Sequence, residues 1–162
     1  MTEQPIPASA QQRISELESA LHAERARREL LERVLAAHHR LSELEPDLPI
    51  DALLQQLLAQ VEELTDSCIS FFHLFAEDQQ TISLQTWSES TLSQSCQASL
   101  HKHHYPVAEA GVWADCIHQR RPVIHNDFNA LPHRKGQPKG HATVVRELVA
   151  PILRAGQIVA II

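Results

Sequence analysis

The stretch HYPVAEAGVWADCIHQRRPVIHNDFNALPHRKG, residues 104–136, has the most informative pattern in this chain of 162 residues. It predicts a strand over His101–Val107, a short helix over Ala110–Gln119 and a strand over Pro122–Asn126. A basic loop then runs from Leu131 to His141. Because this loop contains glycines and prolines, we expect it to be shaped by turns.

Further strands are predicted on either side of this stretch. The run CISFFHLFAEDQQTISLQTWS, residues 68–88, has β-branched and aromatic residues on both sides of the polar turn Glu77–Gln80, which is typical of a hairpin. Two more strands are predicted over Val144–Leu153 and Gln157–Ile162, joined by a glycine turn. The serine-rich segment Ser88–Ser99 is expected to be a loop or a short helix.

Two helices are predicted before these strands. From Gln11 to Glu45 the chain has no proline or glycine and is rich in Ala, Leu, Glu and Arg, which favours one long helix. The prolines that follow cannot continue it. In the second helix apolar residues recur every three or four positions, so one face must pack on another element, and Asp51 is the expected N-terminal cap. The apolar residues of this face are Ile50, Leu53, Leu54, Leu57, Leu58, Val61 and Leu64.

The long helix also carries an imperfect heptad of apolar residues, interrupted at Glu24 and Arg28. The heptad positions are Ile14, Leu17, Leu21, Leu31, Val34, Leu35, Leu41 and Leu44. A lone helix with such a stripe has no core of its own, so we expect it to pair with a second copy as a parallel coiled coil. The alternative is a helix that folds back on its own domain.

Composition and charge argue against several classes of protein. A hydrophobic content of 43% is enough for a core, whereas a formal charge of −6 disfavours a protein that binds nucleic acid. The chain has neither a run of about 18 apolar residues nor the basic-then-apolar start of a signal peptide, so we expect no membrane segment and a cytoplasmic location. The three cysteines are far apart, which indicates reduced thiols.

Together these segments predict an α+β fold with a mainly antiparallel sheet. Their order, and the motifs Gly111–Ala114, His125–Phe128 and Leu131–Gly136, resemble the GAF domains of bacterial sensor histidine kinases and diguanylate cyclases, preceded by a signalling helix. The resemblance covers Asp51–Ile162 and implies a GAF-like antiparallel sheet flanked by helices. It divides the chain into a flexible leader (1–10), a signalling or coiled-coil helix (11–45) and a GAF domain (48–162).

The resemblance also implies a function. Such modules bind a small molecule in a pocket between the sheet and the helix that holds Trp113, under the loop Leu131–His141. Relatives usually continue into a C-terminal helix and an output domain, so we expect this chain to be incomplete at its C-terminus. Its output domain would then lie in a longer protein or act in trans. We do not expect this chain to be an enzyme. The signatures of cyclic-nucleotide-binding and phytochrome-type GAF domains are absent, which leaves the ligand open, haem included.

The candidate ligand-binding residues come from the strands, the short helix and the basic loop of the resemblance. They are Tyr105, Trp113, Cys116, Asn126, Asp127, Phe128, His133, Arg134, Lys135, His141 and Arg146. We predict no catalytic residue and no metal site.

Some of these side chains have alternative roles. Asp127 is expected to accept hydrogen bonds from backbone amides in an Asx-type turn, and Arg146 to pair with Asp127 or Glu147. His133 and His141 are candidate neutral donors, pH sensors or haem ligands.

Two other functions stay open. A core packed solid by Trp87, Trp113 and Phe128 would favour a GAF module that dimerises without a ligand. A cysteine-based redox enzyme or sensor of GAF fold would need two cysteines within disulfide reach. Cys116 itself is expected in the core or the pocket wall, the alternative being a redox-sensing thiol.

Overall fold

The computed structural model describes residues 8–94, 104–135 and 143–162. The chain forms two compact units, Met1–Glu45 and Pro46–Ile162. In the first unit, helix α1 (Ala8–Ser42) covers most of the predicted long helix and ends shortly before Pro46. Most of its heptad side chains are exposed, as the heptad pattern would leave them in a single copy of the chain. They include Ile14, Leu17, Leu21, Leu31, Val34 and Leu35.

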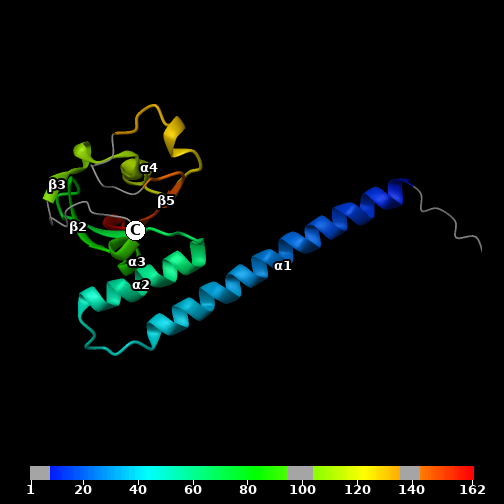
Figure 1. Ribbon diagram of the computed structural model, residues 1–162, viewed down its shortest axis with the longest axis horizontal. Coiled ribbons are helices and arrows are strands. Elements are labelled where there is room, and N and C mark those ends of the chain that lie inside the picture. Colours follow the sequence, from blue (N-terminus) through cyan, green and yellow to red (C-terminus); the bar gives the residue numbers. More distant parts are fainter. Residues whose placement is uncertain (1–7, 95–103, 136–142) are drawn as a thin grey trace, which may run out of the picture. The chain divides into compact units, whose positions relative to one another are not determined.

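The second unit is built on a five-stranded antiparallel sheet with the strand order β3-β2-β1-β7-β6, beside a two-stranded sheet of β4 and β5. The strands are β1 (Phe71–Phe75), β2 (Thr81–Trp87), β3 (His104–Pro106), β4 (Val123–His125), β5 (Glu147–Val149), β6 (Pro151–Arg154) and β7 (Gln157–Ile161). Helices α2 and α4 lie on opposite sides of the five-stranded sheet (Figure 1). The predicted α+β class is therefore confirmed.

The predicted hairpin is formed by β1 and β2. Its turn is fixed by Asp78, whose Oδ1 accepts hydrogen bonds from the backbone amides of Gln80 at 2.8 Å and Thr81 at 2.9 Å. The hydrogen bond from the Thr81 hydroxyl, together with these backbone bonds, lowers the pKa of the Asp78 carboxyl. The strands that flank the turn hold the aromatic residues that sequence periodicity singled out.

The strand predicted over Val144–Leu153 is wrong, because two strands in different sheets replace it. Strand β5 pairs with β4, whereas β6 pairs with β7. Between them Ala150 exchanges backbone hydrogen bonds with Ile162 at 2.8 and 3.0 Å. Pro151 has no N–H to donate, and the chain changes sheets at this point.

The segment before β4 is also more irregular than predicted. In place of one helix over Ala110–Gln119, the chain forms the 3₁₀ turns η1 (Val107–Glu109) and η2 (Val112–Ala114), followed by helix α4 (Asp115–Gln119). A further 3₁₀ turn, η3 (Phe128–Ala130), follows β4.

Helix α2 (Ile50–Thr65) confirms the predicted second helix, but its start differs from the prediction. Pro49 occupies the N-cap position, and its carbonyl accepts from the amide of Leu53 at 3.0 Å. Asp51 lies inside the first turn, where its charge still favours the helix N-terminus. The short helix α3 (Glu89–Gln94) accounts for part of the serine-rich segment. No helix in the described parts of the chain is both long and apolar enough to cross a membrane.

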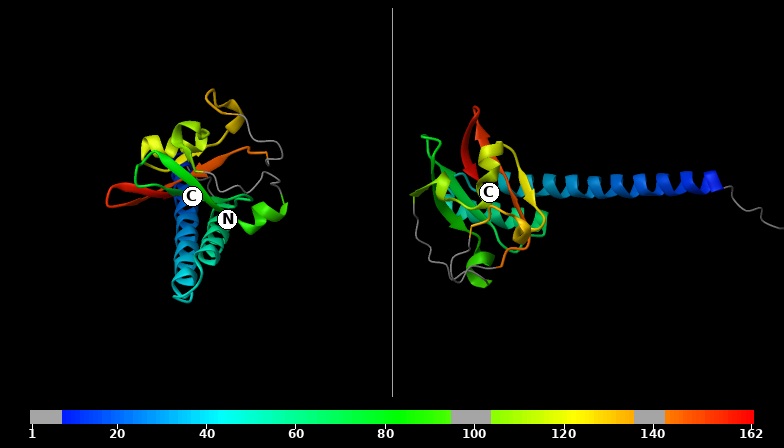
Figure 2. Two further views of the ribbon diagram at one scale, coloured as in Figure 1. Left: turned by 90° about the vertical axis from the view of Figure 1, so that its left-hand side faces the viewer. Right: turned by 90° about the horizontal axis from the view of Figure 1, so that it is seen from above.

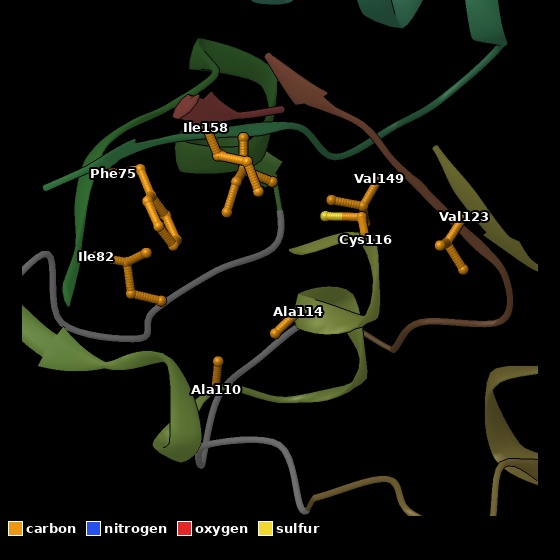
Figure 3. Close-up of a cluster of buried hydrophobic side chains, with 9 residues drawn as sticks. Phe75, Ile82, Ala110, Ala114, Cys116, Val123, Val149 and Ile158 are labelled. Atoms are coloured by element: carbon orange, nitrogen blue, oxygen red, sulfur yellow. The ribbon is translucent and has the colours of Figure 1, made fainter. Parts of the chain in front are cut away.

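Two apolar layers hold this unit together. On the α2 side of the sheet, Leu54 and Leu58 pack with Phe72 and Ala160. The larger cluster on the α4 side joins the five-stranded sheet to the β4–β5 sheet (Figure 3). It consists of Phe75, Ile82, Ala110, Ala114, Cys116, Val123, Val149, Ile158 and Ile161.

The β6–β7 hairpin projects from the rest of the unit (Figure 2). Its turn uses Ala155 and Gly156, both with positive φ, at 49° and 77°. The Arg120 guanidinium, from the end of α4, donates a hydrogen bond to the Gly156 carbonyl. This contact ties the hairpin turn to the α4 side of the sheet.

Candidate functional site

An aromatic cluster lies where the predicted pocket was expected, between the sheet and the turn that holds Trp113. The Trp113 ring stacks on His73 of β1, with ring centroids 4.8 Å apart and an interplanar angle of 28°. Phe71 contacts Trp113 and Trp87 edge-on, each at 5.8 Å. Burial lowers the pKa of His73 to about 4, so its imidazole is neutral at pH 7. The result is an apolar aromatic surface with one uncharged imidazole.

Two residues after Trp113, Asp115 begins a continuous chain of two carboxylates and two imidazoles, which we call the acid–imidazole cluster: Asp115, His125, His133 and Glu147. His125 Nδ1 lies 2.8 Å from Glu147 Oε1, and its Nε2 lies 3.3 Å from Asp115 Oδ2. His133 Nε2 lies 2.8 Å from the same Asp115 oxygen. The cluster thus joins α4, β4, β5 and the start of the basic loop.

Local strand register positions this cluster. His125 and Glu147 are directly opposite in the β4–β5 pair, and the alternation of the strands turns them inward on the same face as Val123 and Val149. Burial raises the pKa of Glu147, and the neighbouring Asp115 charge adds to this, while His125 opposes it. A partly buried carboxylate paired with an imidazole is the main electrostatic feature here.

Cys116 follows Asp115 and points into the apolar cluster next to Val149 (Figure 3). It is 0% exposed. Burial, together with the charges of Asp115 and Glu147, raises the pKa of its thiol to about 12. Such a thiol is protonated at neutral pH, which makes it poorly suited to nucleophilic or redox chemistry. Its burial makes Cys116 a residue of the apolar core.

The described start of the basic loop is held by its side chains. Arg134 Nη1 donates to Asn129 Oδ1 at 3.1 Å, and Lys135 Nζ donates to the Ala108 carbonyl at 2.7 Å. With His133 bonded to Asp115, three consecutive residues attach this segment to the domain. His141 lies outside the described residues.

The other predicted residues have simpler roles. Asp127 Oδ1 accepts from the Ala130 amide at 3.2 Å and caps η3, which is the expected turn role. Phe128 is buried, whereas Asn126 is exposed. Tyr105 lies in β3, where its backbone pairs with Ile82.

The pairing predicted for Arg146 is wrong. Arg146 is exposed just before β5, and the Glu147 carboxylate contacts His125 instead. The cause is strand register, which turns Glu147 toward β4 and the core. Asp127 uses its carboxylate to cap η3.

Sequence reasoning missed Asp115, His125, Glu147 and His73 as site residues. The signal for the pair His125 and Glu147 was present, since each lies in a short strand with apolar neighbours at alternate positions. Only the register of those strands brings the two side chains together. In the described residues, no group of three or more His, Cys, Asp or Glu side chains could hold a metal ion.

A second polar feature lies on the other side of the sheet. A recess of about 300 Å³ is lined by Gln55, Gln56, Ala59, Glu62, Ser88, Glu89 and Ser90. The Glu62 carboxylate accepts hydrogen bonds from three serine hydroxyls at 2.5 to 2.7 Å. Its acceptors are therefore used within the protein, and this network fixes α2 to the start of α3.

Comparison with known proteins identifies relatives of the second unit. A family model described as the GAF domain matches residues 47–162. A methyl sulfide methyltransferase-associated sensor of Methanosarcina acetivorans is 32% identical over 99 residues, which cover 60% of this chain and 10% of that protein. The chain thus spans about a tenth of the length of that relative.

Solved structures share the fold at low sequence identity. The GAF domain of a phosphoenolpyruvate-protein phosphotransferase from Coxiella burnetii is similar with a TM-score of 0.64 and 16% identity, over 82% of this chain and 74% of that one. A free methionine-R-sulfoxide reductase from Neisseria meningitidis, in complex with its substrate, has a TM-score of 0.58 and 16% identity, over 82% and 70% of the two chains. The architecture thus occurs both in a GAF domain of a phosphotransferase and in an enzyme.

Proposed function

Because this chain belongs to the GAF domain family, we propose that it is a sensory module that binds a small molecule at the aromatic cluster and the adjoining acid–imidazole cluster. The observation that carries this proposal is the stacking of Trp113 on His73, with Asp115 and its imidazole partners beginning two residues further along the chain. Ligand sites are typically lined by apolar and aromatic side chains with a few polar groups that orient the ligand. The sensor relative from Methanosarcina acetivorans supports a role in signalling.

The chemistry of the two clusters narrows the ligand. The aromatic faces of Trp113 and Phe71 suit a planar or apolar group. The Asp115 and Glu147 carboxylates accept hydrogen bonds, so they suit a ligand that donates them. A small molecule with an apolar or aromatic body and hydrogen-bond donors at one end fits both clusters.

We further propose that two copies pair through α1 and that the protein works in the cytoplasm. The exposed apolar stripe of α1 supports the pairing, because a parallel coiled coil would bury it. A ligand that binds one conformation of the site more tightly would shift the equilibrium between conformations, and α1 would carry that shift to an output domain.

A thermal-shift screen of the purified protein against a metabolite library tests the binding proposal. Each hit is then titrated by tryptophan fluorescence in the parent and in two variants. Trp113→Leu removes the stacking surface and should weaken binding at least about tenfold, the effect of losing 1.4 kcal/mol. Gln56→Ala, in the recess beside α2, is the matched control and should bind like the parent.

The results separate the sites. Hits that bind equally well to Trp113→Leu would contradict the proposed position of the ligand, and weaker binding to Gln56→Ala would move it to the recess. If no compound stabilises the protein, the binding proposal loses its support.

A GAF module that dimerises without a ligand is the second candidate. The direct contacts of Trp113 with His73 and Phe71 favour it, because these rings pack on one another between the turn and the sheet. This candidate predicts a dimer in sedimentation equilibrium with no bound small molecule. Replacing Leu17 by Asp on the α1 stripe should then give a monomer under either candidate.

A further inference from the structure

Helix α1 is one continuous helix of 35 residues, so a single heptad register can be followed along its apolar stripe (Figure 1). With Ile14 as position a, the stripe supplies the inward a and d positions of a coiled coil. These positions hold Ala10, Ile14, Leu17, Leu21, Glu24, Arg28, Leu31 and Leu35. The leucines and the isoleucine among them are 43% to 67% exposed, so they can pack against a second helix.

Glu24 and Arg28 place two charges in the middle of this apolar seam. In a parallel dimer with both helices in the same register, Glu24 packs beside Arg25 and Arg28 of the second copy, so each carboxylate meets a guanidinium. A shift by one heptad would instead place Glu24 against Leu17 or Leu31. Its charge would then be buried among apolar side chains, which is costly. This polar layer therefore fixes the register of the two helices.

The polar layer does not by itself fix their direction. In an antiparallel pair, position a of one helix lies opposite position d of the other. Glu24 would then face Arg28 of the second copy, and the apolar positions on either side would also meet. The direction must be set by the side chains that flank the seam, at positions e and g.

The flanking charges attract one another in a parallel pair. A residue at g lies beside the residue at e of the next heptad on the partner helix, which brings Arg13 to Glu18 and Arg27 to Glu32. Each pair occurs twice in a symmetric dimer. Within one copy Glu32 Oε1 accepts from Arg28 Nε at 2.8 Å, and its second oxygen can accept from Arg27 of the second copy. The other such pairs hold no like charges: Ala20 with Arg25, and Val34 with His39.

The same charges repel one another in an antiparallel pair. Positions g then meet g, and positions e meet e. Arg27 would face Arg27 of the second copy, Arg25 would face Arg25, and Glu18 would face Glu32. Like charges at neighbouring positions on paired helices destabilise the pair. The flanking charges thus favour the parallel direction.

We propose that α1 is a self-selective pairing surface, whose partner is a second copy of the same helix, parallel and in register. The polar layer sets the register, and the flanking Arg–Glu pairs set the direction. A helix of another protein with apolar residues opposite the polar layer would leave Glu24 and Arg28 buried without partners. The inference rests on the proposed pairing through α1 and adds which helix it selects.

Mixing two charge-reversed variants of the full chain tests this selectivity. Arg27→Glu and Glu32→Arg each bring like charges together in a homodimer, whereas their heterodimer has opposite charges at both contacts. After equal amounts exchange to equilibrium, native mass spectrometry should find at least about 80% heterodimer, compared with about half for random pairing. Loss of the Arg28–Glu32 contact within a helix affects homodimers and heterodimers alike, so it cancels.

A second pair of variants controls for the overall charge of the two proteins. Arg33→Glu and Glu29→Arg make the same charge changes at the outer positions f and b of the heptad, away from the partner helix. These variants should mix at random. A heterodimer fraction equal to that of the first pair would overturn the proposal.

Disulfide cross-linking tests the direction. In a background of Cys68→Ser and Cys96→Ser, Ala10→Cys places a thiol at a d position near the start of α1. In a parallel pair the two thiols share one layer and lie within disulfide reach, so a covalent dimer should form. In an antiparallel pair they are about 48 Å apart at a rise of about 1.5 Å per residue, and residue 10 lies opposite Ser42. Preferential cross-linking of Ala10→Cys to Ser42→Cys in a mixture would overturn the proposal.

Sedimentation equilibrium of the parent protein separates this inference from the proposed function. A monomer at every concentration would remove the pairing through α1 and this inference with it. A dimer whose charge-reversed variants mix at random, or whose helices cross-link in the antiparallel direction, would overturn this inference and leave pairing through α1 in place. Ligand titrations report on small-molecule binding independently of both.

Discussion

The thiol of Cys116 gives a sharp test of whether this domain performs cysteine chemistry. The residue is 0% exposed, and the pKa of its thiol is raised from 9.0 to about 12. At pH 8 the thiolate fraction is then about 10⁻⁴, compared with about 10⁻¹ for a thiol at its ordinary pKa, because each pH unit changes the fraction tenfold. The thiolate needed for attack is thus about a thousandfold scarcer.

A compensating effect reduces this factor. A more basic thiolate is a better nucleophile, with a Brønsted coefficient of about 0.4–0.5, which over three pKa units restores roughly twentyfold in rate. The net electronic effect is therefore a reaction about fiftyfold slower than that of an ordinary thiol. Burial slows the reaction further, because the reagent reaches the sulfur only when the domain opens.

The assay compares two single-thiol proteins with a disulfide reagent at pH 8. Cys68→Ser with Cys96→Ser leaves Cys116, and Cys96→Ser with Cys116→Ala leaves the exposed Cys68. We expect Cys116 to react at least about fiftyfold more slowly, and the two thiols to react at similar rates in concentrated urea. Rates within about fivefold of each other in the native protein would refute this reasoning and favour a redox function.

Three further predictions concern the layers around the site. Leu58→Ala, at a residue with 0% exposure, should lower the free energy of unfolding by about 3 kcal/mol in urea titrations. Leu53→Ala, on the same helix but 36% exposed, should lower it by less than about 1 kcal/mol. Equal losses would contradict the packing of α2. Asp127→Ala removes the cap of η3 and should cost about 1 kcal/mol, and Asn126→Ala next to it should be nearly neutral. The pKa of His73 is lowered from 6.5 to about 4 in the folded state, so the unfolded chain binds the proton more tightly. The free energy of unfolding should therefore decrease as pH falls from 6.5 towards 4, by about 2 kcal/mol at pH 5. A His73→Phe variant should lack this part of the pH dependence.

The long helix and the hairpin were predictable because their signals are local. Residues 11–45 lack helix breakers, and the aromatic and β-branched residues on both sides of Asp78 have strand character regardless of tertiary context. The change of sheet at Pro151 was not predictable in the same way. Residues before and after it both have strand character, and only the tertiary pairing assigns them to different sheets.

The candidate site was predicted only in part, for the same reason. Trp113 and His133 belong to motifs that the family resemblance singled out, and both contact residues that it did not. The partners His73, His125 and Glu147 lie in separate strands, and their meeting depends on strand register and on which face each side chain occupies. These are long-range properties that a local sequence pattern does not encode.

Native mass spectrometry of freshly purified protein, with an absorption spectrum of the same sample, tests the central claim most directly. The sensory function predicts a dimer with a reproducible extra mass that dissociates on unfolding, and that is lost in the Trp113→Leu variant while Gln56→Ala retains it. A dimer of bare polypeptide mass in every preparation, with a spectrum accounted for by its aromatic residues, would contradict a bound small molecule and favour the ligand-free dimerisation module.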